Sequence, residues 1–139
     1  MEIRSEILSA SQYADLCRSA GWNVPPLSQV QRALEGSLCV YSVWEDGGLV
    51  GMVRVCGDGA MCFVLRELVV IPEYRCRGIG TALMARVCEY VDSRLDPGMK
   101  ACLELQSAVG RESFYVRMGF QRRPSETQGA GMFLMWEKK

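Results

Sequence analysis

Residues 61–84 read MCFVLRELVVIPEYRCRGIGTALM, and this stretch decides the fold. It opens with a long apolar run that ends at Pro72, which is typical of a buried strand closed by a proline. A basic loop with two glycines follows. Beyond the loop, apolar residues recur at helical spacing and predict a long amphipathic helix, with a stripe formed by Leu83, Met84, Val87, Cys88, Val91 and Leu95. The stretch therefore predicts a strand, a loop and a helix in direct succession.

The segments on both sides of this stretch alternate between helical and strand-like patterns. The elements that we expect there are a strand near 3–8, a helix with Ser9 or Ser11 as its N-cap, a helix with Ser28 as its N-cap, a hairpin with strands at 38–44 and 49–55, a strand at 101–105, a short helix at 110–118 and a final strand at 132–136. No repeat or linker interrupts this order. The sequence predicts one mixed α/β domain over residues 1–139.

Composition excludes several classes of function. The 139 residues include 16 basic and 16 acidic side chains, so the formal net charge is zero. Nonspecific nucleic-acid binders usually carry a basic excess, and we therefore expect no nucleic-acid partner. The absence of histidine excludes Ser-His-Asp triads, Cys-His dyads and histidine-ligated zinc. Any acid or base must be a carboxylate, a tyrosine, a lysine, a cysteine or water.

The seven cysteines form no C-x-x-C pair and no zinc-knuckle spacing, so we expect no metal site. Their pattern is typical of reduced, mostly buried thiols in a cytoplasmic protein. The first residues show no signal-peptide pattern, and no stretch approaches the roughly 18 apolar residues of a membrane span. We therefore expect a cytoplasmic protein with no membrane partner.

The loop at 73–80 has the properties of an anion site. A helix N-terminus presents unpaired N–H groups and a partial positive charge, and glycines allow close approach to the backbone. Arg75 and Arg77 add positive charge, and Thr81 adds a hydroxyl. These features suit a pyrophosphate. The alternative is a solvated turn whose glycines only help the helix to pack on the strand.

Two ordered motifs resemble the GNAT superfamily of acetyltransferases. Arg75-x-x-Gly78-x-Gly80 is similar to the acetyl-CoA loop of that superfamily, and Phe114-Tyr115-x-x-x-Gly119-Phe120 is similar to its C-terminal motif. The resemblance implies a mixed, mostly antiparallel sheet flanked by helices. It also implies that acetyl-CoA lies in a splay between the strands that carry Val70 and Leu103. The cofactor-binding residues that it implies are Leu68, Val69, Val70, Arg75, Cys76, Arg77, Gly78, Ile79, Gly80 and Thr81, with no metal.

The implied reaction is acetyl transfer to an amine by direct attack. The N–H of Val70 is expected to polarise the thioester carbonyl. Tyr115 is the acid that is expected to protonate the departing thiolate, because a phenol with a pKa of about 10 is protonated at pH 7. The alternative for Tyr115 is a packing role.

Glu67 is the first candidate for the base, and Glu104 and water are its rivals. Strand alternation places Glu67 on the same face as Val69 and opposite to Val70. Glu67 could instead be a structural partner for Arg54 or Arg66.

The acceptor is expected to be a small molecule with a primary amine. The C-terminal segment from Gly119 to Phe133 is similar to the end of plant-type serotonin N-acetyltransferases, although this similarity is weaker than that of the loop. The alternatives are a protein N-terminal or lysine acetyltransferase and a non-catalytic acyl-CoA-binding domain. The predicted final strand could pair in a homodimer.

Overall fold

The computed structural model describes residues 1–139 and divides into two compact units, Met1–Leu105 and Gln106–Lys139. The elements of the first unit are β1 (Glu2–Arg4), α1 (Ala10–Ser19), α2 (Leu27–Glu35), β2 (Cys39–Glu45), β3 (Gly48–Gly57), β4 (Cys62–Val70), a 3-10 turn (Pro72–Tyr74), α3 (Ile79–Ser93) and β5 (Cys102–Leu105). The second unit holds α4 (Glu112–Arg117). The predicted succession of strand, loop and long helix is confirmed.

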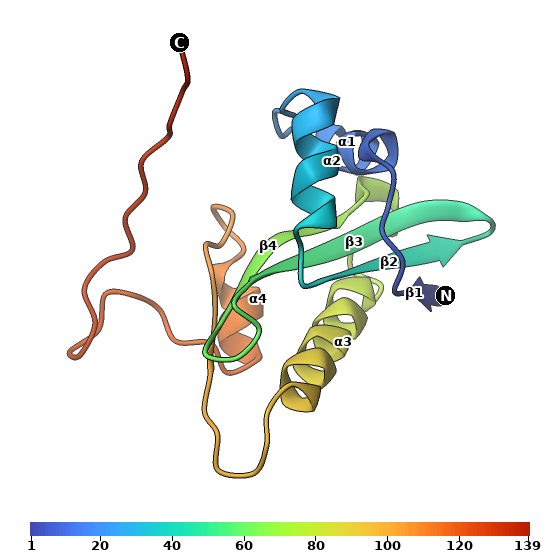
Figure 1. Cartoon of the computed structure of the whole chain (residues 1–139). Coiled ribbons are helices and arrows are strands. Elements are labelled where there is room, and N and C mark those ends of the chain that lie inside the picture. Colours follow the sequence, from blue (N-terminus) through green and yellow to red (C-terminus); the bar gives the residue numbers. More distant parts are fainter. The chain divides into compact units, whose positions relative to one another are not determined.

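The five strands of the first unit form one sheet in the order β1-β2-β3-β4-β5. The first three pairs of neighbours are antiparallel, and β4 and β5 are parallel. In Figure 1, α1 and α2 lie on one face of this sheet and α3 lies on the other. The predicted mixed, mostly antiparallel sheet flanked by helices is confirmed.

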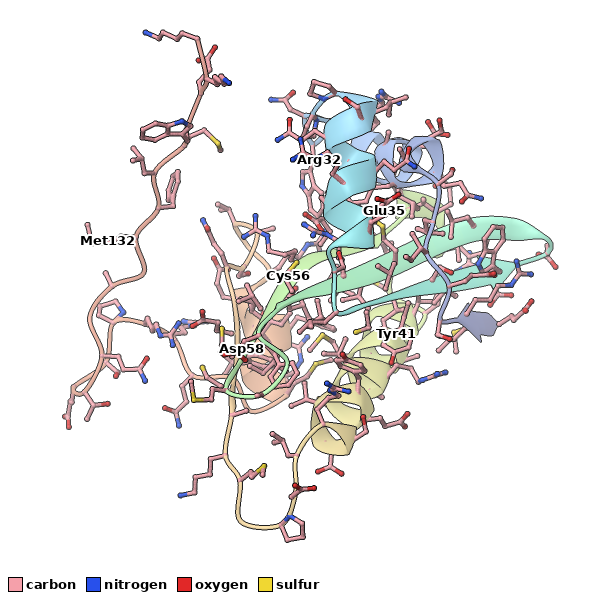
Figure 2. The ribbon with its side chains drawn as sticks, viewed as in Figure 1. Arg32, Glu35, Tyr41, Cys56, Asp58 and Met132 are labelled. Atoms are coloured by element: carbon pink, nitrogen blue, oxygen red, sulfur yellow. The ribbon has the colours of Figure 1, made fainter.

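Apolar side chains fill the space between the sheet and the helices on each face. One buried cluster joins the first two helices to the sheet and includes Tyr13, Leu16, Cys17, Val30, Leu34, Val40, Met52 and Val69. On the other face, Phe63 of β4 meets Tyr90 of α3 edge to face, with ring centroids 6.3 Å apart. The guanidinium of Arg86 lies over the ring of Tyr41 on this face, and Figure 2 labels Tyr41 there. Val69 and Phe63 therefore mark opposite faces of β4.

A bulge interrupts the alternation of β4. Val53 pairs with Leu68 and Val55 pairs with Leu65, so two residues of β4 stand opposite the single residue between the valines. These two residues are Arg66 and Glu67, and the residue opposite them is Arg54. Such an extra residue bends and twists a strand locally. Glu67 lies next to Arg54 at this bulge, on the face that α1 and α2 cover.

The pairing between β4 and β5 covers only the first part of β4. The four residues Cys62–Leu65 pair with Cys102–Leu105, and no pair follows Leu65. Within the first unit, the remaining residues of β4, 66–70, pair with β3 alone. The strand therefore has an open edge from Arg66 to Val70, on the side from which β5 has ended.

The turn between β3 and β4 is built around Gly57 and Asp58 (Figure 2). The Oδ1 atom of Asp58 accepts hydrogen bonds from the N–H groups of Ala60, Met61 and Cys62 at 2.8–2.9 Å. Gly57 has φ +134°, and a Cβ atom there would lie 2.1 Å from the carbonyl oxygen of Cys62. This turn aligns the start of β4 against β3.

The predicted strand at 132–136 is wrong. In the second unit the segment is irregular, and its five side chains are 78% to 94% exposed. Figure 2 shows Met132 on an extended length of chain. A strand needs a neighbouring strand to pair its N–H and C=O groups, and the second unit contains no strand. The apolar character of the segment alone therefore does not make it a strand.

The structure also tests three smaller predictions, of which one is confirmed and two are wrong. Of the two serines predicted as N-caps of the first helix, Ser9 is the N-cap of α1, where it forms a capping box with Gln12, and Ser11 lies within the helix. Ser28 is not a cap, because α2 begins at Leu27 with Pro26 at the N-cap. The prediction of mostly buried thiols is wrong. Cys17 alone is buried, and Cys88 is exposed although it belongs to the predicted apolar stripe.

Candidate active site

The N-terminus of α3 is open to a ligand. Its N-cap residue Gly78 has φ +79°, which glycine adopts without steric cost, and no side chain caps the helix. The N–H of Ala82 makes the first hydrogen bond of the helix, to the carbonyl oxygen of Gly78. The N–H groups of the three residues before Ala82 have no partner within a helix of this geometry. They form a set of donors for an anion.

The side chains at the N-terminus of α3 offer a ligand fewer contacts than the backbone does. The side chain of Ile79 is buried and lies against the sheet beside Gly51, so only its backbone can face a ligand. Thr81 is exposed. Cys76 is exposed and has φ +61°, which turns the chain just before the helix. The loop therefore offers mainly backbone groups.

The two loop arginines lie in different places. The guanidinium of Arg77 stacks over the ring of Tyr74 at 4.9 Å, and its side chain is exposed. Arg75 is half-buried, and its Nε donates a hydrogen bond to the carbonyl oxygen of Val70 at 3.0 Å. Positive charge is thus placed both at the surface of the loop and against the end of β4.

The open edge of β4 presents backbone groups that no strand uses. The N–H of Ile71 donates to the carbonyl oxygen of Val50 at 2.9 Å, so this pair is of the hydrogen-bonded kind. Hydrogen-bonded and non-hydrogen-bonded pairs alternate in an antiparallel ladder. Val69 therefore faces β3, whereas the N–H and C=O groups of Leu68 and Val70 point to the open edge. Of the three predicted pantetheine contacts in β4, Leu68 has both backbone groups available and Val70 has its N–H, because the carbonyl oxygen of Val70 accepts from Arg75.

These features fit an extended ligand that carries amides and a pyrophosphate. An amide chain can pair with Leu68 and Val70 as an added strand would. The α3 N-terminus lies a short loop further along the same chain and can take the phosphates. The residues present in the first unit therefore suit coenzyme A.

Glu67 lies in a buried polar cluster. Arg54 Nε donates to Glu67 Oε2 at 2.6 Å, and Arg54 Nη2 donates to Oε1 at 3.1 Å. The two side chains are only 11% and 14% exposed. Of the two arginines proposed as structural partners of Glu67, Arg54 is the one that forms the ion pair.

Two further contacts surround the ion pair. Arg54 Nη1 donates to the Oγ of Ser37 at 3.3 Å and to the Sγ of Cys56 at 3.0 Å. Burial, together with the nearby Glu67 charge, raises the pKa of Tyr13 above its usual value. The cluster therefore joins α1, the end of α2 and two strands through polar side chains.

Glu104 has a different position. It lies on β5 opposite Val64, in the part where β4 and β5 are paired. Its carboxylate accepts a long hydrogen bond from the thiol of Cys102 at 4.0 Å. Glu104 is thus placed beside the paired half of β4, and Glu67 lies in the half with the open edge.

Tyr115 belongs to the second unit and lies on α4. Its ring is half-buried between Phe114 and Phe120, at centroid distances of 5.1 Å and 5.8 Å. Burial raises the pKa of the Tyr115 phenol. The hydroxyl is therefore protonated at neutral pH, as a general acid must be.

Sequence reasoning missed the Tyr13–Ser37–Cys56 surroundings of the ion pair. Ser37 and Arg54 are 17 residues apart, and Glu67 is 13 residues beyond Arg54. The pairing of β3 with β4 brings the carboxylate and the guanidinium together, and no local pattern marks this pairing. The one available signal is that Arg54 and Glu67 are charged residues within mainly apolar strands, and Arg66 beside Glu67 gives the same signal.

The family model of the GNAT acetyltransferase domain matches residues 36–122, which is more than half of the chain. The chain belongs to this family. An uncharacterised N-acetyltransferase of the ycf52 type from Prochlorococcus marinus is 29% identical over 121 residues, which cover 84% of this chain and 65% of the relative. A histone acetyltransferase from Glycine max is 29% identical over 125 residues, covering 82% of this chain and 52% of the relative. The chain thus spans between about half and two-thirds of these relatives.

Solved structures show the same fold. A probable acetyltransferase from Staphylococcus aureus superposes with a TM-score of 0.85 at 22% identity, covering 97% of this chain and 98% of that one. An N-acetyltransferase from Thermoplasma acidophilum, solved in complex with coenzyme A, gives a TM-score of 0.63 at 16% identity, with 92% and 95% covered.

Two further findings bear on earlier expectations. No helix combines the length and the apolar character that crossing a bilayer requires. A relative from Arabidopsis thaliana, 28% identical over 134 residues that cover 82% of this chain and 50% of the relative, is named as chloroplastic. The cytoplasmic location therefore stays a prediction.

Proposed function

We propose that the protein transfers the acetyl group of acetyl-CoA to the primary amine of a small molecule by direct attack. The observation that carries the proposal is the open edge of β4 next to the uncapped N-terminus of α3. Membership of the GNAT family supports the reaction class. The family match also crosses the boundary between the two units, which supports treating residues 1–139 as one domain.

The residues of the first unit supply binding and polarisation. Acetyl-CoA supplies an activated acetyl thioester. The backbone of Leu68 pairs with its amide arm, and the N–H groups of Ile79, Gly80 and Thr81 bind its phosphates. The N–H of Val70 points to the open edge and donates to the thioester carbonyl oxygen as charge develops there. No imidazole is needed, in agreement with the absence of histidine.

Tyr115→Phe is expected to lower kcat by at least about tenfold, because it removes the proton donor for the departing thiolate. The affinity for acetyl-CoA should change little, since the hydroxyl is not proposed to bind the cofactor. The measurement is steady-state kinetics together with calorimetric titration of coenzyme A. Tyr90→Phe is the control, because its hydroxyl contacts the carbonyl oxygen of Leu38. An unchanged kcat in Tyr115→Phe would leave only the packing role.

Glu67→Gln is expected to lower kcat/KM at pH 7 by at least about tenfold, because it removes the proposed base. The pH–rate profile should then move toward the pKa of the acceptor amine, since only solvent takes its proton. Glu104→Gln, measured in the same way, tests the rival carboxylate. If Glu67→Gln keeps the original profile, water or Glu104 is the base. A bell-shaped pH–rate profile of the unmodified protein, centred at about pH 6.5, would contradict a mechanism without histidine.

The acceptor decides between the remaining functions. A small aryl, alkyl or sugar amine is the proposed class, and the similarity to a histone acetyltransferase supports a protein amine as the second candidate. Release of coenzyme A, followed with a thiol reagent, tests both across a panel of small amines and lysine peptides. Turnover of peptides alone would overturn the small-molecule proposal. Tight binding of acetyl-CoA without turnover of any amine would indicate a non-catalytic binding domain.

We also propose a homodimer that pairs through residues 132–136. The support is that this apolar segment is exposed and has no strand partner in its own unit. Light scattering that reports the mass of one chain at all concentrations would exclude the dimer.

A further inference from the structure

The side chain of Arg75 connects the loop to the end of β4. Its Nε donates a hydrogen bond to the carbonyl oxygen of Val70 at 3.0 Å, in a partly buried contact. On the other side of the same peptide unit, the N–H of Ile71 donates to the carbonyl oxygen of Val50 at 2.9 Å. The peptide between residues 70 and 71 is therefore held from both sides, by β3 and by the loop.

The loop is folded in a way that makes this contact possible. The N–H of Tyr74 bonds to the carbonyl oxygen of Ile71 at 3.0 Å, and that of Arg75 bonds to Pro72 at 3.3 Å. These bonds close a tight turn directly after the strand, so Arg75 returns to the strand end. Arg77, two residues later, stacks on Tyr74 and makes no hydrogen bond to β4.

Arg75 uses only one part of its guanidinium in this contact. Its two Nη groups make no hydrogen bond or ion pair with the rest of the chain. A guanidinium carries five N–H donors in a planar fork, so the Nη groups can contact an anion while Nε holds the carbonyl. One side chain can therefore serve the loop and the strand at the same time.

We propose that Arg75 is a positioning residue for acetyl transfer, which acts through the backbone of Val70. This inference rests on the proposed function. By holding the carbonyl of Val70, Arg75 keeps the last residues of β4 extended where no second strand supports them. The N–H of Val70 then stays directed at the open edge. A donor to a developing oxyanion is effective only when it is fixed before the reaction, so the loss of Arg75 should appear mainly in kcat.

Two substitutions separate this role from simple attraction of phosphate. In Arg75→Gln, the amide nitrogen lies the same number of bonds from Cα as Nε does, so the donor stays and the charge is lost. In Arg75→Lys, a carbon occupies that place, so the charge stays and the donor is lost. Arg77→Gln removes a loop charge that does not touch β4 and is the matched control.

The test combines kinetics with hydrogen exchange measured by NMR at the Ile71 amide. For Arg75→Lys, we expect exchange at Ile71 to be faster and kcat to be lower, each by at least about tenfold, with an affinity for coenzyme A within about threefold. For Arg75→Gln, we expect slow exchange and a kcat well above that of Arg75→Lys, with coenzyme A bound about tenfold more weakly. Arg77→Gln should weaken coenzyme A binding and leave exchange at Ile71 unchanged.

These experiments distinguish failure of the positioning role from failure of the proposed acetyl transfer. If Arg75→Lys keeps the original exchange rate and kcat, the positioning role is overturned although acetyl transfer stands. If the unmodified protein acetylates no amine, the proposed function fails, and the catalytic part of this proposal fails with it. The exchange rates at Ile71 then still report whether Arg75 anchors the strand, because they do not depend on turnover.

Discussion

Arg54→Met should lower the free energy of unfolding by about 3–5 kcal/mol, because it leaves the carboxylate of Glu67 buried without its counter-charge. The pair is almost fully shielded from water, and both carboxylate oxygens accept a hydrogen bond from Arg54. The substitution also removes the donor to Ser37, which connects the end of α2 to the sheet. Urea unfolding followed by circular dichroism measures the change.

A control and a double variant make this result specific. Arg66→Met removes the neighbouring arginine of the bulge, which is exposed, and should change stability by less than about 0.5 kcal/mol. Arg54→Met combined with Glu67→Met replaces the pair by apolar side chains and should recover much of the loss. A double variant that is no more stable than Arg54→Met would show that packing of the arginine, not the buried charge, carries the effect.

Gly57→Ala should lower the free energy of unfolding by more than about 2 kcal/mol, because two penalties coincide. The residue has φ +134°, where side chains are rarely found, and a Cβ atom would lie 2.1 Å from the carbonyl oxygen of Cys62. The obstructing atom belongs to the backbone of β4, which moves less easily than the end of a flexible side chain. Relief of the clash therefore requires the start of β4 to shift. Thermal and urea unfolding both measure the loss.

Gly47→Ala is the matched control for Gly57→Ala. Gly47 also has a positive φ, +77°, but a Cβ atom there meets nothing within 4 Å. Its expected cost is about 1 kcal/mol, from backbone conformation alone. Equal losses in the two variants would mean that the close approach to Cys62 is relieved without cost.

The succession of strand, loop and helix could be predicted from the sequence because each part is a local pattern. The apolar run before Pro72 and the helical stripe after Gly80 involve residues that are close together in the chain, and the structure confirms both elements. The cap at Ser9 is equally local. Local periodicity therefore located the loop that carries the candidate anion site.

Features that depend on distant partners could not be predicted in the same way. The bulge at Arg66 and Glu67 depends on pairing with β3, and the same pairing places Arg54 beside Glu67. The contact of Arg75 with Val70 depends on how the loop folds back. The prediction of a strand at 132–136 is wrong for the same reason, because an apolar segment forms a strand only where another strand pairs with it.

The open edge of β4 also has a consequence for the behaviour of the protein in solution. Unpaired N–H and C=O groups on a strand can pair with a strand from any other molecule and seed association. The bulge at Arg66 interrupts the regular spacing of these groups, and the exposed charge of Arg66 disfavours a second strand there. The length of edge that is left spans Leu68 to Val70, which is too short to template a sheet yet long enough to hold one extended ligand.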